Sequence, residues 1–455
     1  WIKTLKHNQF GGILADDMGL GKTLQVITFL WSEFQESAPG ENRRALVITP
    51  ASLVFNWMNE IERFAPGLPA TVVTGDVKER KALIKNAGER EVLITSYDLL
   101  KRDLKAYQNL DFAVQIIDEA QYIKNHGTQV AKAVKEIRSE FRLALTGTPV
   151  ENRLSELWSI FDFLMPGFLY SYEKFRKEIE LPAVQYSNSD AMERLQKMIR
   201  PFVLRRLKRD VLKDLPDKLE KDMFSPLESE QKELYEAHTE RLRLMLGMQS
   251  DAEFRTSKLQ ILAEITRLRQ ICCYPGLVYE GYKGNSSKLE MCMELVQNAV
   301  NGGHKLLLFS QFTTMLDVLA VRLKKAKVSF YMLTGSTSKE KRAQMVHAFN
   351  EDDTSVFCIS LKAGGTGLNL TAADIVIHYD PWWNLAVQNQ ATDRAYRIGQ
   401  QNVVSVYRLF MKDTIEERIR ALQERKRELA DEILSGEGIG QALISREEVL
   451  ELLGR

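Results

Sequence analysis

The sequence has few of the features that mark disulfide-stabilised, zinc-binding or membrane proteins. Its four cysteines, Cys272, Cys273, Cys292 and Cys358, form no CxxC pair and have no nearby histidine at ligand spacing. This pattern argues against structural zinc and a disulfide framework, and favours buried thiols in a reducing compartment. No apolar run approaches the roughly 18 residues that span a bilayer, and no signal peptide precedes the first expected strand, so no membrane partner is expected.

The chain also lacks an excess of charge of either sign. Lys and Arg number 62 and Asp and Glu number 61, for a net charge of +1. Any binding to nucleic acid must therefore come from local patches and not from a globally basic surface. The fractions of hydrophobic residues (44%) and charged residues (27%) are typical of globular proteins. A length of 455 residues exceeds one ordinary core and predicts two or more domains.

Short β-rich runs alternate with amphipathic helical runs in both halves of the chain, which predicts α/β domains with parallel sheets. Most of the expected strands are continuously apolar, as in strands buried on both faces. Between Trp158 and Lys283 strand signals vanish, and an inserted, mainly helical region is expected there. The expected strands are Gly12 to Ala15, Ala45 to Thr49, Val92 to Thr95, Ala113 to Asp118, Leu143 to Leu145, Lys305 to Phe309, Val328 to Leu333, Ser355 to Ile359, Ile375 to Tyr379 and Val403 to Leu409.

The strongest local motif is a glycine-rich run between an expected strand and an expected helix, which is the context of a phosphate-binding loop. Glycines let backbone N–H groups converge on phosphate oxygens at a helix N-terminus. Lys22 can place its charge on the β- and γ-phosphates, and the Thr23 hydroxyl can ligate Mg²⁺. A simple glycine-rich helix cap is the alternative. The candidate nucleotide-binding residues are Asp16, Asp17, Met18, Gly19, Leu20, Gly21, Lys22 and Thr23.

Two acids, Asp118 and Glu119, end an apolar strand about a hundred residues after this loop. Asp118 can hold Mg²⁺ through water, while Glu119 can orient or deprotonate the attacking water. Alone, such a pair is often only a solvated turn, but beside a phosphate-binding loop it is the expected second half of an ATPase site.

A third element, in the second half of the chain, contains Gln390, Arg394 and Arg397. The two arginines are three residues apart, so a helix would place them on one face. Guanidinium groups that reach across a cleft can neutralise charge on a γ-phosphate. The alternative is a surface helix with ordinary salt bridges.

These motifs resemble those of helicase superfamily two, and specifically the Swi/Snf-type double-stranded DNA translocases, over nearly the whole chain. Further runs follow in the order of that family. They are Leu46 to Phe64 (LVITPASLVFNWMNEIERF), Ile94 to Tyr97 (ITSY), Leu145 to Trp158 (LTGTPVENRLSELW), Phe202 to Pro216 (FVLRRLKRDVLKDLP), Leu268 to Pro275 (LRQICCYP), Leu308 to Phe312 (LFSQF), Thr334 to Ser336 (TGS) and Ala363 to Leu370 (AGGTGLNL).

The resemblance implies two RecA-like parallel-sheet lobes with helical insertions and a C-terminal helix. The implied boundaries are 1–200 for lobe 1 with an insertion at about 161–200, 201–218 for a linker, 219–285 for a helical protrusion, 286–411 for lobe 2, and 412–455 for a C-terminal helical brace.

The resemblance also assigns roles. ATP and Mg²⁺ are the implied cofactors, Asp118 and Glu119 would serve magnesium and water, and Arg394 and Arg397 would act as arginine fingers with Gln390 nearby. Contacts to the phosphates of double-stranded DNA would not read sequence. The implied DNA contacts are Pro50, Ala51, Ser52, Ser96, Tyr97, Gly335, Ser336, Lys362, Ala363, Gly364, Gly365 and Asn369, together with Arg205 and Arg206 of a basic run that fits a hinge role equally well.

Two alternatives stay open at this stage, a strand-separating helicase of the same superfamily and an inactive ATPase scaffold. The partner is expected to be duplex DNA with a protein obstacle or cargo, and the motor to be monomeric. The compact insertion and the lack of a basic localisation run favour a cytoplasmic bacterial or archaeal protein over a nuclear one. The adenine-reading segment of the family is expected upstream of Trp1, so the chain is expected to be a piece of a longer protein.

Overall fold

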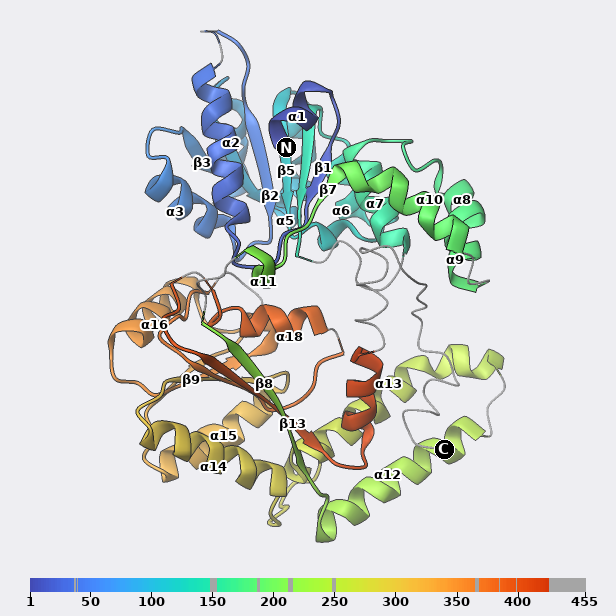
Figure 1. Ribbon diagram of the computed structural model, residues 1–455, viewed down its shortest axis with the longest axis vertical. Helices are drawn as coiled ribbons and strands as arrows, with labels where there is room; N and C mark the ends of the chain where they lie inside the picture. Colours follow the sequence, from blue (N-terminus) through green and yellow to red (C-terminus); the bar gives the residue numbers. More distant parts are fainter. Residues whose placement is uncertain are drawn as a thin grey trace. The chain divides into compact units, whose positions relative to one another are not determined.

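The computed structural model divides the chain into two compact units, the first comprising described residues up to 211 and the second those from 216 to 424. Each is an α/β unit built on a parallel sheet (Figure 1). In the part of the chain that the structure describes, no helix combines the length and apolarity needed to cross a membrane. The described residues are 1–36, 38, 40–147, 154–185, 189–211, 216–247, 251–364, 368–383, 385–397 and 399–424.

The sheet of the first unit has seven strands in the order β3-β4-β2-β5-β6-β1-β7, and every neighbouring pair is parallel. The central strands are buried along almost their whole length, as their continuous apolar sequences predict. The strands are β1 (Gly12–Leu14), β2 (Ala45–Thr49), β3 (Ala70–Val72), β4 (Val92–Ser96), β5 (Phe112–Asp118), β6 (Ser139–Leu145) and β7 (Val203–Leu204).

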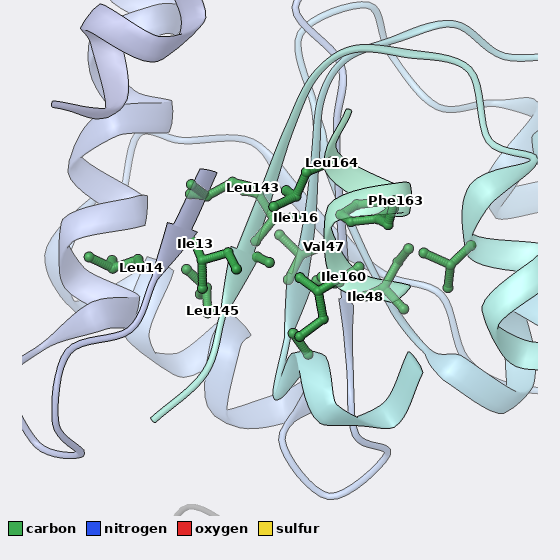
Figure 2. Close-up of a cluster of buried hydrophobic side chains, with 14 of the residues drawn as sticks. Ile13, Leu14, Val47, Ile48, Ile116, Leu143, Leu145, Ile160, Phe163 and Leu164 are labelled. Atoms are coloured by element: carbon green, nitrogen blue, oxygen red, sulfur yellow. The ribbon is translucent and has the colours of Figure 1, made fainter. Parts of the chain in front are cut away.

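Helices cover this sheet and contribute to a single apolar core. Figure 2 shows Ile160 and Phe163 of α7 beside Val47 of β2 and Ile116 of β5, in the cluster that fills the unit. Helices α8, α9 and α10 lie together beside α7 (Figure 1). The helices are α1 (Ile2–His7), α2 (Lys22–Glu36), α3 (Val54–Phe64), α4 (Val77–Lys85), α5 (Tyr97–Tyr107), η1 (Ala120–Ile123), α6 (Gln129–Lys135), α7 (Leu154–Leu164), α8 (Tyr172–Phe175), the π-helical η2 (Arg176–Glu180), α9 (Leu181–Gln185), α10 (Ser189–Ile199), η3 (Arg200–Phe202) and α11 (Lys208–Val211).

The sheet of the second unit has six strands, all parallel, in the order β10-β11-β9-β12-β13-β8. Its strands alternate between two apolar layers. Leu307 and Phe309 of β9 face the cluster of α16, whereas Leu306 and Leu308 face that of α14 and α15. The strands are β8 (Lys218–Ser225), β9 (Leu306–Ser310), β10 (Phe330–Leu333), β11 (Val356–Ser360), β12 (Ile375–His378) and β13 (Val404–Met411).

Two long helices of this unit pack on each other and on the start of the C-terminal helix, which is helical over 415–424. Ile415 and Ile419 are buried there; the rest of the expected brace, 425–455, lies outside the described residues. The helices are α12 (Ser229–Gly247), α13 (Asp251–Cys273), η4 (Pro275–Leu277), α14 (Ser287–Asn301), α15 (Thr313–Lys325), α16 (Lys339–Glu351), α17 (Leu361–Gly364) and α18 (Leu385–Thr392).

The predicted fold class is confirmed, and each of the ten expected strands overlaps an observed one. The region between Trp158 and Lys283 is mainly helical, as predicted, but the absence of strand signals there misled, because β7 and β8 lie in it. β8 falls at the start of the expected helical protrusion, yet it pairs with β13 over its whole length (Figure 1). Its charged side chains are held by cross-strand ion pairs, including Arg408 Nε to Asp222 Oδ1 at 2.6 Å. Because β8 carries these charges, it contains no continuous apolar run, and apolar patterning did not predict it.

A fully buried ion pair joins α14 to the C-terminal helix. Lys288 Nζ lies 2.7 Å and 2.8 Å from the two carboxylate oxygens of Glu416, and both side chains are completely inaccessible. The backbone N–H of Met411 also donates to Glu416 at 2.8 Å. Removing one partner of such a pair leaves an uncompensated buried charge.

We therefore expect Lys288→Met to lower the free energy of unfolding of the second unit by about 3–5 kcal/mol. The double variant Lys288→Met/Glu416→Gln should recover most of this loss, because it removes both charges and keeps an acceptor for Met411. Urea unfolding curves of the three proteins provide the measurement. A double variant as unstable as the single one would contradict this explanation.

Candidate nucleotide site and nucleic-acid surface

The expected phosphate-binding loop connects β1 to α2, and Lys22 is the first residue of that helix. Gly19 and Gly21 have φ angles of 83° and 72°, a conformation that other residues adopt only with strain. The glycines are therefore required by the turn. The loop ends at the N-terminus of a 15-residue helix, where free backbone N–H groups and the helix dipole favour an anion.

Lys22 lies at the centre of a group of carboxylates. Its Nζ donates to the backbone oxygens of Asp16 at 2.5 Å and Asp17 at 3.3 Å. Burial lowers the pKa of Lys22, while the charges of Glu119, Asp118, Asp16 and Asp17 raise it, and the net direction is downward. The ammonium is thus poorly solvated, and an anionic ligand would stabilise its charged form.

Asp118 ends β5 and is held by three donors. Its Oδ2 accepts hydrogen bonds from Trp57 Nε1 at 2.8 Å and Thr49 Oγ1 at 3.2 Å, and its Oδ1 accepts one from the Glu119 N–H at 2.9 Å. Burial nevertheless raises the pKa of Asp118 above its ordinary value, against the effects of these donors and of Lys22. Trp57 and Thr49 were not among the predicted site residues.

Glu119 has a left-handed backbone conformation, with φ 53° and ψ 59°. Such strain in a residue other than glycine persists only where its surroundings enforce it, and it is common at functional sites. The carboxylate accepts from Gln121 Nε2 at 2.7 Å, and Gln121 Oε1 in turn accepts from Thr146 Oγ1 at 3.1 Å. Gln121 therefore links Glu119 to the end of β6. The motif DEAQ contains this glutamine, but its partner could not be read from the sequence.

Tyr97 supports the same turn from the other side. Its hydroxyl donates to the backbone oxygen of Asp118 at 2.7 Å, and its ring stacks on that of Tyr122 with centroids 5.0 Å apart. Tyr97 is only 3% exposed, so its side chain is committed to the core. The DNA contact predicted for Tyr97 stays a prediction, and the buried side chain leaves only backbone atoms available for it.

The donor set fits Mg²⁺ bound together with a nucleotide. Carboxylate and hydroxyl oxygens, here those of Asp118 and Thr23, are the ligands that Mg²⁺ prefers, and the ion commonly takes only one or two protein ligands with phosphates and water completing its shell. Among the described residues, no group of three or more His, Cys, Asp or Glu side chains could hold a metal ion alone. The carboxylates around Lys22 also outnumber it, and this excess of negative charge favours a cation.

Asp16 is placed differently from the expectation. Its side chain is completely buried and faces Arg206, whose Nε lies 3.0 Å and 3.1 Å from the two carboxylate oxygens. Only the backbone oxygen of Asp16 meets Lys22. The DNA contact predicted for Arg206 stays untested, but its guanidinium has this partner inside the first unit.

Other residues predicted to contact DNA lie where neighbouring strands end. In the first unit Ala51 and Ser52 are exposed after β2, and Ser96 caps α5 after the adjacent β4, with its Oγ 3.3 Å from the Leu99 N–H. Pro50 lies beside Ala51 but is buried. Because parallel strands end at one edge of a sheet, the two loops share that edge.

The second unit repeats this arrangement. Gly335 and Ser336 are exposed after β10, and α17, which contains Lys362, Ala363 and Gly364, follows the adjacent β11. Asn369 is exposed, and its backbone oxygen accepts from Asn350 Nδ2 at 2.9 Å. Gly365 lies outside the described residues.

The expectation that Arg394 and Arg397 share a helix face is wrong. Helix α18, which contains Gln390, ends at Thr392, and both arginines lie in the turns that follow. Gln400 fixes these turns, since its Nε2 donates to the backbone oxygens of Ala395, Thr371 and Ala373 at 3.1, 3.2 and 2.9 Å. Arg394 is 7% exposed, and the N–H of Leu370 donates to its backbone oxygen at 3.0 Å.

His378 holds α18 against the second sheet. Its Nε2 lies 2.8 Å from Thr392 Oγ1 at the end of that helix, and its ring stacks on Phe309. Burial lowers the pKa of His378 to about 3, with Arg408 and Lys218 acting in the same direction and Glu220 opposing them. The ring is therefore neutral in the folded protein at neutral and mildly acidic pH.

A glycine-rich loop at a helix N-terminus and an acidic strand end lie in the first unit, and an arginine-bearing segment lies in the second; these are the features that the resemblance to two-lobed nucleotide-dependent motors predicts. Residues 1–277 match the SNF2-related domain and residues 287–399 match the helicase conserved C-terminal domain. The chain belongs to the SNF2-related family, and the family predicted from its motifs is confirmed.

Curated proteins with helicase names match most of this chain. The chain is 40% identical over 454 residues to an uncharacterised ATP-dependent helicase of Mycoplasma pneumoniae (99% of this chain, 43% of the relative). It is 40% identical over 455 residues to the putative ATP-dependent helicase/translocase YwqA of Bacillus subtilis (96% and 48%). The chain thus spans less than half the length of these relatives. A solved Sulfolobus solfataricus SWI2/SNF2 ATPase core in complex with dsDNA is 37% identical, with 96% of this chain and 91% of that chain covered and a TM-score of 0.47.

The neutral His378 predicts a dependence of stability on pH. Its folded pKa lies below the ordinary value of 6.5, so the unfolded state takes up a proton first, and stability is lost as the pH falls from about 6.5 towards 3. Between pH 7.5 and 5 the loss due to His378 should be about 2 kcal/mol. In His378→Gln, which keeps a hydrogen-bonding group but does not titrate, this contribution should vanish. Denaturation of both proteins at the two pH values measures it; equal losses in both would contradict it.

Proposed function

We propose that the chain hydrolyses ATP and uses the energy to move along double-stranded DNA without separating the strands. The observation that carries the first part is the grouping of Lys22 with Asp118 and the strained Glu119 at one edge of the first sheet. These groups match the needs of phosphoryl transfer, where positioning and charge neutralisation supply most of the rate enhancement.

Each residue has a defined task in this proposal. Lys22 and the backbone N–H groups of the loop bind the phosphates. Thr23 and Asp118 would hold Mg²⁺, which would supply positive charge to neutralise the phosphate oxygens. Glu119 orients the attacking water and accepts its proton, while Gln121 holds the Glu119 carboxylate in place. The arginine-finger role predicted for Arg394 and Arg397 is kept as part of the proposal.

The proposed movement along double-stranded DNA rests on the loops at the strand ends and on the family. Exposed small residues such as Ser52 and Ser336 suit contacts to phosphate oxygens, which position a protein without reading base sequence. The printed description of the Bacillus subtilis relative as a putative helicase/translocase is consistent with such movement. A protein obstacle or cargo on the DNA, a monomeric motor and a DNA-associated location in the cytoplasm complete the proposal.

A strand-separating helicase is the second candidate, because the Mycoplasma pneumoniae relative is described as an ATP-dependent helicase. The two candidates share the nucleotide chemistry and differ in the track. An inactive scaffold is disfavoured, since Lys22, Asp118 and Glu119 are all present in a connected site.

We expect ATP hydrolysis to be stimulated more by duplex DNA than by single-stranded DNA or RNA of equal length. Glu119→Gln should lower kcat by about 100-fold or more while nucleotide still binds, because only proton transfer and water orientation are lost. Lys22→Ala should instead abolish nucleotide binding. Steady-state phosphate release and equilibrium binding of a fluorescent ATP analogue measure these effects.

Equal stimulation by all three nucleic acids would refute the duplex track but not the ATPase. Hydrolysis by Glu119→Gln at the parent rate would refute the assigned chemistry and favour a different site.

A further inference from the structure

The chain segment that leads towards the second unit begins alongside the phosphate-binding loop. The pairing of β1 with β7 continues beyond both strands, because the N–H of Ala15 donates to the backbone oxygen of Leu204 at 2.7 Å and that of Asp17 to Arg206 at 3.0 Å. The segment following β7 therefore forms one side of the loop. We call residues 205–211 the connector.

The side chain of Asp16 fastens the connector to the loop. Its fully buried carboxylate accepts from both the backbone N–H of Arg206, at 3.0 Å, and the guanidinium, whose Nη2 also contacts it. Gln25 of α2 completes the group, with its Nε2 3.3 Å from Asp16 Oδ2 and its Oε1 2.6 Å from Arg206 Nη2. A planar guanidinium suits this two-point contact better than a lysine would.

The loop residues that bind the connector also bind Lys22. The backbone oxygens of Asp16 and Asp17 accept hydrogen bonds from Lys22 Nζ, and the Asp17 carboxylate accepts one from the N–H of Lys208 in the connector, at 3.0 Å. Both residues that hold the lysine ammonium are therefore fixed by the connector. A change in the connector's position would alter the geometry that Lys22 presents to phosphates.

We propose that Arg206 is a positioning residue for nucleotide binding, acting through Asp16 on the phosphate-binding loop and Lys22. The proposal rests on the proposed ATPase function and adds a link between nucleotide affinity and the connector. Since the connector leads to the second unit, which begins at described residue 216, nucleotide affinity depends on how the connector is held. Arg206 thereby contributes to ATP binding without touching ATP.

A purely structural role for Arg206 is the competing explanation, and the chain offers a matched control. Arg80 and Asp103 form a second arginine–carboxylate pair in the same unit, in which both side chains are buried, with Nε to Oδ2 at 2.6 Å and Nη2 to Oδ1 at 3.1 Å. That pair joins α4 to α5. Losing it should lower stability without disturbing the loop.

The test measures the Kd of the full chain for a fluorescent ATP analogue with Mg²⁺, together with the thermal unfolding midpoint without nucleotide. We expect Arg206→Met to weaken binding about 10-fold or more, as loss of a charge-assisted contact predicts. Arg206→Lys should give a smaller loss. Arg80→Met should lower the unfolding midpoint but leave the Kd at the parent value.

A double variant, Asp16→Asn/Arg206→Met, covers the case in which an unpaired buried Asp16 unfolds the protein. If Arg206 acts through Asp16, binding by the double variant should be no weaker than by the Arg206→Met or Asp16→Asn single variants that stay folded. Parent-like Kd values for folded Arg206→Met, or for the double variant when the single one unfolds, would overturn the inference. A parent protein that binds no nucleotide would instead refute the proposed function, so the two failures are distinguishable.

Discussion

Parallel pairing of the strands is the constraint on which the site depends. In the order β2-β5-β6-β1-β7 each strand runs in the same direction, so the loops that follow them emerge at a single edge of the first sheet. Residues far apart in the chain meet there: Lys22 after β1, Asp118 at the end of β5, Thr146 after β6 and Arg206 after β7. Catalytic groups that sit at strand ends on a rigid sheet can be held with the precision that phosphoryl transfer requires.

Charged side chains at this edge of the first sheet are poorly solvated. Burial shifts the pKa of Lys22 downward and that of Asp118 upward, so each charged form is disfavoured by its surroundings and supported by the other. Hydrogen bonds from Trp57 and Thr49 orient Asp118, and Gln121 orients Glu119. In the proposed function, such fixed and poorly solvated groups would meet a polyanion and a divalent cation without rearranging, which is a condition for effective electrostatic catalysis.

Continuous apolar runs made most of the strands predictable from sequence, and the glycine-rich run predicted the loop between β1 and α2. Three strands escaped prediction: β3 is short and half-buried, β7 has only two residues, and β8 is a charged edge strand whose charges are paired with Arg408. Local spacing also misled, since it placed Arg394 and Arg397 on a helix that ends at Thr392. The spacing of two residues cannot show whether the helix extends to them, and here α18 ends before either arginine.

Long-range side-chain partners were beyond sequence reasoning for a related reason. Asp16 and Arg206 are 190 positions apart, and nothing in either neighbourhood signals the other. The basic run that contains Arg206 could be read as a hinge or as a phosphate contact, and only tertiary structure shows that one of its arginines is paired with the nucleotide loop. The sequence motifs therefore predicted which residues carry the chemistry, and the structure adds the contacts that hold those residues in place.

The most direct measurement of a duplex-tracking motor is displacement of a third strand bound to double-stranded DNA, followed together with separation of the two duplex strands. The full chain is expected to displace the third strand only with hydrolysable ATP, to leave the duplex strands paired, and to lose displacement with Glu119→Gln. Separation of the duplex strands, or ATP turnover on duplex DNA without any displacement, would contradict the proposed movement.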